Sequence, residues 1–225
     1  GFSDRVIELV AEETGHPFVG APNKFEAMGG KDACVETSGA LKTIAVSLTK
    51  IANDIRWLGS GPRCGIGEIS LPSLQPGSSI MPGKVNPVIP EAVLMAAAQV
   101  AGNDVTVTWG GASGVFELNV MMPVIAHNLL QSIQILAASA SLLAERCIEG
   151  LTANRERAAE MVEKSLAMVT SLAPRIGYDR AAEIAKEAFR TGRTVRELAT
   201  EQGVLPPEEL EEALDARAQT EGGVK

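Results

Sequence analysis

The segment 77–87, Gly-Ser-Ser-Ile-Met-Pro-Gly-Lys-Val-Asn-Pro, brings two hydroxyls, a cation and an amide together in a short stretch. Lys84 can neutralise a carboxylate, and Asn86 can donate a hydrogen bond to one. Ser78 or Ser79 can act as a nucleophile, or as a base if its proton is readily lost. These residue types indicate chemistry on a small anionic substrate.

Two glycines in the same segment suit an anion site. Gly77 and Gly83 permit backbone N–H groups to point inward, and such an arrangement stabilises an oxyanion. Serine, glycine and proline are also common in ordinary surface loops. The residue types by themselves therefore leave a catalytic loop and a surface loop with an incidental lysine both open.

This segment lies in a long irregular region. The stretch from Gly59 to Pro90 is rich in proline and glycine, which interrupt helices and strands. Long irregular stretches inside a compact domain are usually functional or disordered. We expect a functional loop between helices.

Apolar residues recur at helical spacing on both sides of the loop. The pattern predicts a short helix over 4–13 and a long amphipathic helix over 25–58. The segment 91–108 is apolar on every face, as in a helix buried within a bundle or an oligomer, and glycines at 110–114 are expected to end it. A second long helix is predicted from 118 to about 146.

The composition favours an all-α fold. Aromatic residues make up only 4% of the 225 residues, so the core consists of Ala, Leu, Val, Ile and Met, which suit close helix packing. We predict a long-helix bundle domain over 1–150, which carries the loop near 75–87. A small helical C-terminal domain is predicted over 151–225.

Charge and cysteine content exclude several classes of protein. The net charge of −8 argues against a nucleic-acid binder, which needs a basic face. Cys34, Cys64 and Cys147 are odd in number and widely spaced, which indicates neither a disulfide framework nor a zinc site and fits a reducing cytoplasm. No apolar run has the length of a membrane span, so no membrane partner is expected.

The segment 77–87 matches every fixed position of G-S-S-x-M-P-x-K-x-N-P, and so resembles the signature of the fumarase/aspartase superfamily. Within that superfamily, Gly83 before the lysine is similar to fumarases, whereas aspartases usually carry alanine there. Five further segments look like fumarase segments: 21–27, 51–58, 60–69, 110–120 and 176–179. The chain thus resembles the C-terminal half of a class II fumarase over almost its whole length.

The resemblance implies reversible hydration of fumarate to L-malate, with no metal and no organic cofactor. It implies that Ser78 is the base that removes the C3 proton of malate, with Ser79 as its hydroxyl neighbour. Lys84 and Asn86 would hold a substrate carboxylate and stabilise the aci-carboxylate that forms. Glu91 resembles the acid that partners the catalytic histidine of the family.

That histidine belongs to the other half of the family's chain. His16 and His127 are interpreted as structural. The resemblance implies a homotetramer whose active sites take residues from three subunits, so the chain is expected to be inactive unless a partner supplies the N-terminal half. An aspartate ammonia-lyase and a non-catalytic oligomerising fragment are the alternatives.

Overall fold

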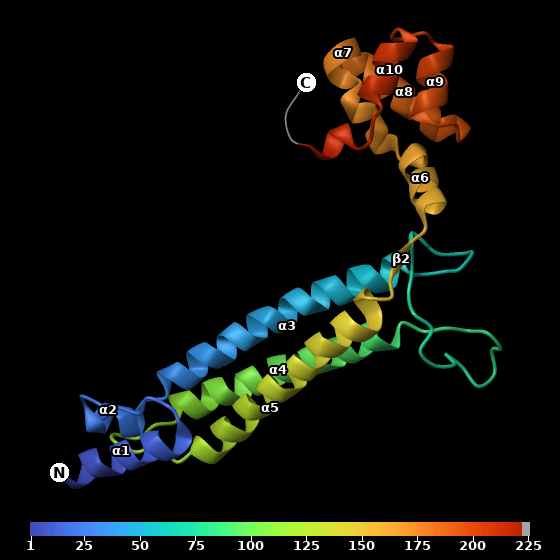
Figure 1. Ribbon diagram of the computed structural model, residues 1–225. Coiled ribbons are helices and arrows are strands. Elements are labelled where there is room, and N and C mark those ends of the chain that lie inside the picture. Colours follow the sequence, from blue (N-terminus) through green and yellow to red (C-terminus); the bar gives the residue numbers. More distant parts are fainter. Residues whose placement is uncertain (222–225) are drawn as a thin grey trace. The chain divides into compact units, whose positions relative to one another are not determined.

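The computed structural model describes residues 1–221 (Figure 1). Contacts group the chain into two units. The first comprises Gly1–Trp57 and Leu71–Leu151, and the second comprises Leu58–Ser70 and the chain from Thr152 onward. The predicted domains, 1–150 and 151–225, stay a prediction. The boundary between the two units lies close to residue 151, but the contacts also group Leu58–Ser70 with the second unit.

Three long helices form the first unit. They are α3 (Asp32–Leu58), α4 (Val88–Ala112) and α5 (Met122–Leu143). Figure 1 shows them running alongside one another, with α4 antiparallel to the other two. Their shared core is built from small and branched residues: Ala45, Ala97, Val100 and Leu136. The predicted all-α bundle is confirmed.

Buried polar contacts fix the register of these helices. Asp104 of α4 is 4% exposed and accepts hydrogen bonds from Ser38 and from the Lys42 ammonium, both on α3. Asn103, 2% exposed, donates to the Ser132 hydroxyl of α5 at 3.0 Å. A buried polar group left without its partner is costly, so each contact disfavours a slipped alignment.

The predicted helix over 25–58 is wrong in one respect, because it is divided into α2 (Lys24–Gly29) and α3. Gly30 adopts an extended conformation (ψ 145°) that ends α2. The Lys31 ammonium then donates to three backbone carbonyls between residues 27 and 30, at 2.8–3.1 Å. Such capping satisfies carbonyls that a helix end leaves free. Apolar spacing does not reveal it.

The predicted helix end at the glycines is also wrong, because α4 continues through Gly110 and Gly111 to Ala112. A Cβ atom at Gly110 would lie 2.6 Å from Cγ1 of Ile125 on α5. The glycine therefore allows the two helices to approach closely instead of ending one of them. At its other end, α4 begins at Val88, one turn earlier than predicted.

Helices α1 (Phe2–Thr14) and α5 end in different ways. Helix α1, predicted over 4–13, ends at Gly15, which has φ 70°. Helix α5 begins at Met122, later than predicted, and continues directly into a π-helical turn, η1 (Ala144–Ile148).

In the second unit, two short strands pair antiparallel: β1 (Ile69–Ser70) and β2 (Thr152–Ala153). The Arg157 guanidinium holds the preceding loop by donating to the carbonyls of Ile66 at 2.9 Å and Gly65 at 3.2 Å. These contacts explain why 58–70 groups with residues more than eighty positions later in the chain.

Short helices make up the rest of the second unit: α6 (Arg155–Lys164), η2 (Leu166–Ser171), α7 (Ala173–Ile176), α8 (Tyr178–Thr191), α9 (Val195–Glu201), α10 (Pro207–Ala213) and η3 (Ala218–Thr220). Leu172, Ile184 and Leu198 lie at its core, each no more than 1% exposed. The Thr194 hydroxyl caps α9 by accepting a hydrogen bond from the Glu197 N–H. Within residues 1–221, no helix is both long enough and apolar enough to cross a membrane.

Candidate functional site

The loop that carries the signature is closed at its base by two hydrogen bonds. The Gly77 N–H donates to the Lys84 carbonyl at 2.7 Å, and the Asn86 side-chain amide donates to the Gly77 carbonyl at 2.9 Å. A Cβ atom at residue 77 would lie 2.7 Å from the Lys84 carbonyl oxygen, so glycine is required at this crossing. At the tip, Gly83 takes φ 76°, a left-handed conformation. These features hold residues 78–84 in a defined turn.

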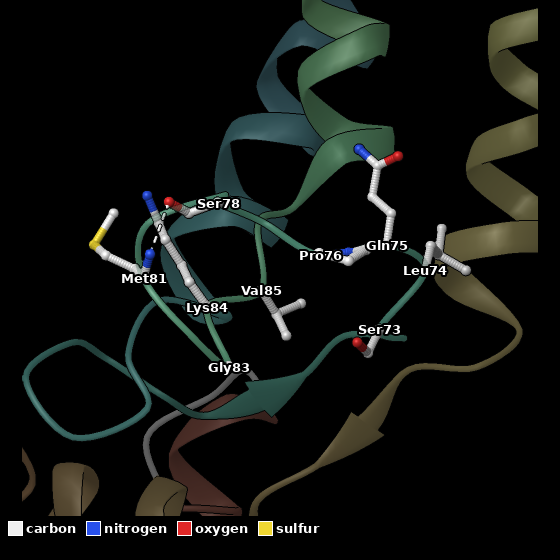
Figure 2. Close-up of a pocket in the computed structure, with 9 residues that line it drawn as sticks. All are labelled: Ser73, Leu74, Gln75, Pro76, Ser78, Met81, Gly83, Lys84 and Val85. Carbon is white, nitrogen blue, oxygen red and sulfur yellow. Dashed lines mark hydrogen bonds between the residues drawn. The ribbon is translucent and has the colours of Figure 1, made fainter.

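Ser78 lies at the start of this turn and is half-buried. Its Oγ accepts hydrogen bonds from the backbone N–H groups of Ile80 and Met81, each at 3.2 Å; Figure 2 shows the bond to Met81. Two backbone N–H groups are therefore directed at the Ser78 hydroxyl oxygen.

A hollow of about 510 Å³ opens beside this turn. Ser78 and Lys84 both line it, as Figure 2 shows. The remaining lining comes from residues of the same loop: Ser73, Leu74, Gln75, Pro76, Met81, Gly83 and Val85. The hollow thus offers an ammonium and a hydroxyl to a ligand, an arrangement that suits a carboxylate beside a proton to be removed.

The other predicted site residues lie outside the lining of the hollow. Ser79 is exposed, and Asn86 uses its amide N–H to close the loop. Glu91 is half-buried in the first turn of α4. The structure therefore brings Ser78 and Lys84 together but does not bring Ser79, Asn86 or Glu91 to the same hollow. The functional roles of all five residues stay predictions.

The two histidines and the acidic residues form no further centre. His16 follows α1 and His127 lies on α5, and both side chains are exposed. Among residues 1–221, no three His, Cys, Asp or Glu side chains are grouped as metal ligands.

Two polar residues of the hollow were missed by the sequence analysis. Ser73 and Gln75 line it from the segment just before the signature. Their only signal was their position within the irregular stretch. Neither lies in a segment that carries the resemblance, so the sequence provided no reason to select them.

Two family profiles match the chain. A profile described as "Lyase" matches residues 1–102, and one described as "Fumarase C C-terminus" matches residues 168–221. Fumarate hydratase 2 of Arabidopsis thaliana is 57% identical over 211 residues, which are 94% of this chain and 42% of the plant protein. The class II fumarate hydratase of Mycobacterium tuberculosis is 52% identical over 222 residues, which are 96% of this chain and 47% of that protein.

The chain belongs to the class II fumarase family. It aligns with the C-terminal part of these fumarases and spans less than half of their length.

Solved structures agree with this family assignment. The class II fumarase of Schistosoma mansoni superposes with a TM-score of 0.83 at 42% identity, covering 88% of this chain and 41% of that chain. The fumarate lyase:delta crystallin of Brucella melitensis superposes with a TM-score of 0.87 at 48% identity, covering 94% of this chain and 46% of that chain. The fold is therefore that of fumarase-type lyases.

Proposed function

We propose that this chain supplies the signature-loop part of a fumarate hydratase site, which converts fumarate and L-malate reversibly. The observation that carries the proposal is that Ser78 and Lys84 line one hollow, in a chain whose relatives are named fumarate hydratases. The substrate is accordingly a small dicarboxylate. A lysine ammonium attracts such an anion even though the chain carries a net charge of −8, because local charge dominates at short range.

In the proposed reaction, Ser78 removes a proton from C3 of malate. The electron pair left on C3 spreads into the adjacent carboxylate, which becomes an aci-carboxylate with two negative charges. Lys84 stabilises that second charge more strongly than it stabilises the ground state, so it lowers the barrier. The C2 hydroxyl then leaves with a proton as water, and fumarate forms. Asn86 closes the base of the loop through its hydrogen bond to the Gly77 carbonyl. Ser79 is the hydroxyl neighbour of the base, and Glu91 partners the histidine that acts in the family.

The group that protonates the leaving hydroxyl is proposed to come from the N-terminal half of the enzyme, which in the relatives lies outside the part that aligns with this chain. Both histidines of the chain lie outside the lining of the hollow. We therefore expect the chain alone to be inactive. We also propose that the assembled enzyme lies in the cytoplasm, because three widely spaced cysteines fit a reducing compartment.

Assembly into a homotetramer is part of the same proposal. On α4, Met95 and Trp109 are each 69% exposed and Val105 is 57% exposed. Large apolar side chains exposed together on one helix are typical of a subunit that buries them against other copies.

The test is the loss of fumarate absorbance on hydration. The chain is assayed alone, then with the N-terminal half of a relative, and then in that mixture as Ser78→Ala or as the matched variant Ser79→Ala. We expect activity in the mixture only, with Ser78→Ala reducing it at least about 100-fold and Ser79→Ala reducing it less.

Absence of activity in every mixture would overturn the proposal. Release of ammonia from aspartate, in place of fumarate hydration, would instead identify an ammonia-lyase.

A further inference from the structure

The π-helical turn η1 (Ala144–Ile148) lies next to the residues on both sides of the signature loop. In η1, the Glu149 N–H donates to the carbonyl of Ala144, five residues earlier, at 3.0 Å. A single turn of this kind at the end of an α-helix changes which side chains face inward, and such turns are frequent near functional sites. Here Cys147 faces inward and is 2% exposed, whereas Ile148 is 45% exposed. Burial raises the pKa of the Cys147 thiol, so this buried side chain stays neutral.

Cys147 faces both ends of the loop. It lines a void of about 10 Å³ together with Pro72, which precedes the loop, and with the segment 86–90, which follows it. A pocket of this size holds about one water molecule, so Cys147 lies close to both ends of the loop. Helix α4, which begins at Val88, also packs against η1.

Gly150 makes the closest approach. A Cβ atom at this position would lie 2.7 Å from Cγ of Pro72 and 3.5 Å from its Cβ. The proline ring is rigid and cannot turn aside as a flexible side chain could. Any larger residue at 150 therefore displaces Pro72 and the loop that follows it.

A displacement of Pro72 reaches the site along the chain, through the four residues between Pro72 and Gly77. Gly77 lies five residues further along and is bonded to the Lys84 carbonyl and to the Asn86 side chain. The turn thus contacts the chain on both sides of the loop, and two hydrogen bonds join Gly77, the residue before Ser78, to Lys84 and Asn86.

We propose that the turn from Ala144 to Gly150 is the rigid support that sets the position of the Ser78–Lys84 loop, with Cys147 and Gly150 as its positioning residues. Its catalytic consequence rests on the proposed fumarase function, but the structural coupling does not. Neither residue touches the hollow, so they act through Pro72 and the 86–90 segment.

The test is amide hydrogen exchange of the 225-residue chain, followed by NMR, at Gly77 and Lys84. Gly150→Ala is compared with Gly102→Ala, a helix position where a Cβ atom meets nothing within 4 Å. We expect Gly150→Ala to speed exchange of the two loop amides about tenfold, while the amides of α4 and α5 stay protected and Gly102→Ala leaves the loop unchanged. Equal loop exchange in the two variants would overturn the proposal.

A compensating pair keeps the test decisive if Gly150→Ala folds poorly. Pro72→Ala removes the same contact from the opposite side and is also expected to speed loop exchange. In the double variant the two alanine methyls replace the ring, so loop exchange should fall below that of Pro72→Ala alone. Additive effects would overturn the proposal.

Exchange is measured without turnover. Faster loop exchange in Gly150→Ala, together with no fumarate hydration by the assembled protein, would therefore refute the proposed function and leave this coupling standing.

Discussion

At the scale of single residues, the arrangement of Ser78 and Lys84 depends on backbone geometry more than on neighbouring charges. Two amide N–H groups donate to the Ser78 hydroxyl, and the crossing at Gly77 brings the Lys84 backbone to the base of the loop. The Lys84 side chain itself is exposed and reaches the hollow from one edge. Its contribution should therefore be to binding and catalysis and not to folding.

Lys84→Ala is expected to lower kcat/KM of the mixture with an N-terminal half about 100-fold or more, because the charge that forms on the substrate loses its counterion. Lys84→Arg should restore little, since a planar guanidinium does not reproduce a compact ammonium. Both variants should unfold at the same temperature as the unaltered chain. Lys24→Ala, another exposed lysine, serves as the control, and a similar loss of activity there would argue against the assignment.

At the scale of elements, one arginine connects three helices of the second unit. Arg196 of α9 donates to both carboxylate oxygens of Glu163 on α6 at 3.0 Å, and to Glu211 on α10 at 2.7 Å. It also donates to the Leu214 carbonyl at 3.2 Å. The hydrogen bonds with Glu163, and then those with Glu211, raise the pKa of Arg196. The guanidinium is therefore charged at every pH at which the protein folds.

Arg196→Lys is expected to destabilise the second unit by about 1–2 kcal/mol, because an ammonium cannot form the two parallel bonds to Glu163. The estimate is modest because both side chains keep part of their surface in water. Thermal unfolding followed by circular dichroism measures the change. Arg190→Lys is the matched control, since Arg190 is 75% exposed and its pair with Glu187 is 3.9 Å long. An equal shift in both variants would contradict the role of Arg196.

At the scale of the whole molecule, the exposed apolar residues of the bundle predict self-association. Trp109→Glu places a charge at a 69% exposed position of α4, where association would bury it. We expect this change to shift sedimentation toward smaller species while leaving helix content unchanged. Phe189→Glu alters an aromatic residue that is 81% exposed on α8 of the second unit and should leave sedimentation unchanged. A monomeric unaltered chain would refute this prediction and would weaken the tetramer proposal.

The sequence determined the helical fold class, the position of the signature loop and the family. Helical periodicity involves residues three and four apart, so α1, α4 and α5 are evident without coordinates. The residues of the signature lie within eleven positions, so Ser78 and Lys84 could be selected together. Each of these conclusions rests on information that is local along the chain.

Only the tertiary structure decided how distant segments meet. The separation of α2 from α3 depends on the hydrogen bonds that the Lys31 ammonium donates to the carbonyls at the end of α2. The continuation of α4 through Gly110 depends on Ile125 of another helix. The use of Asn86 to close the loop, and the contact of Gly150 with Pro72, likewise join residues that no periodic pattern relates. Contacts of this kind follow from packing in three dimensions, for which spacing along the sequence carries no signal.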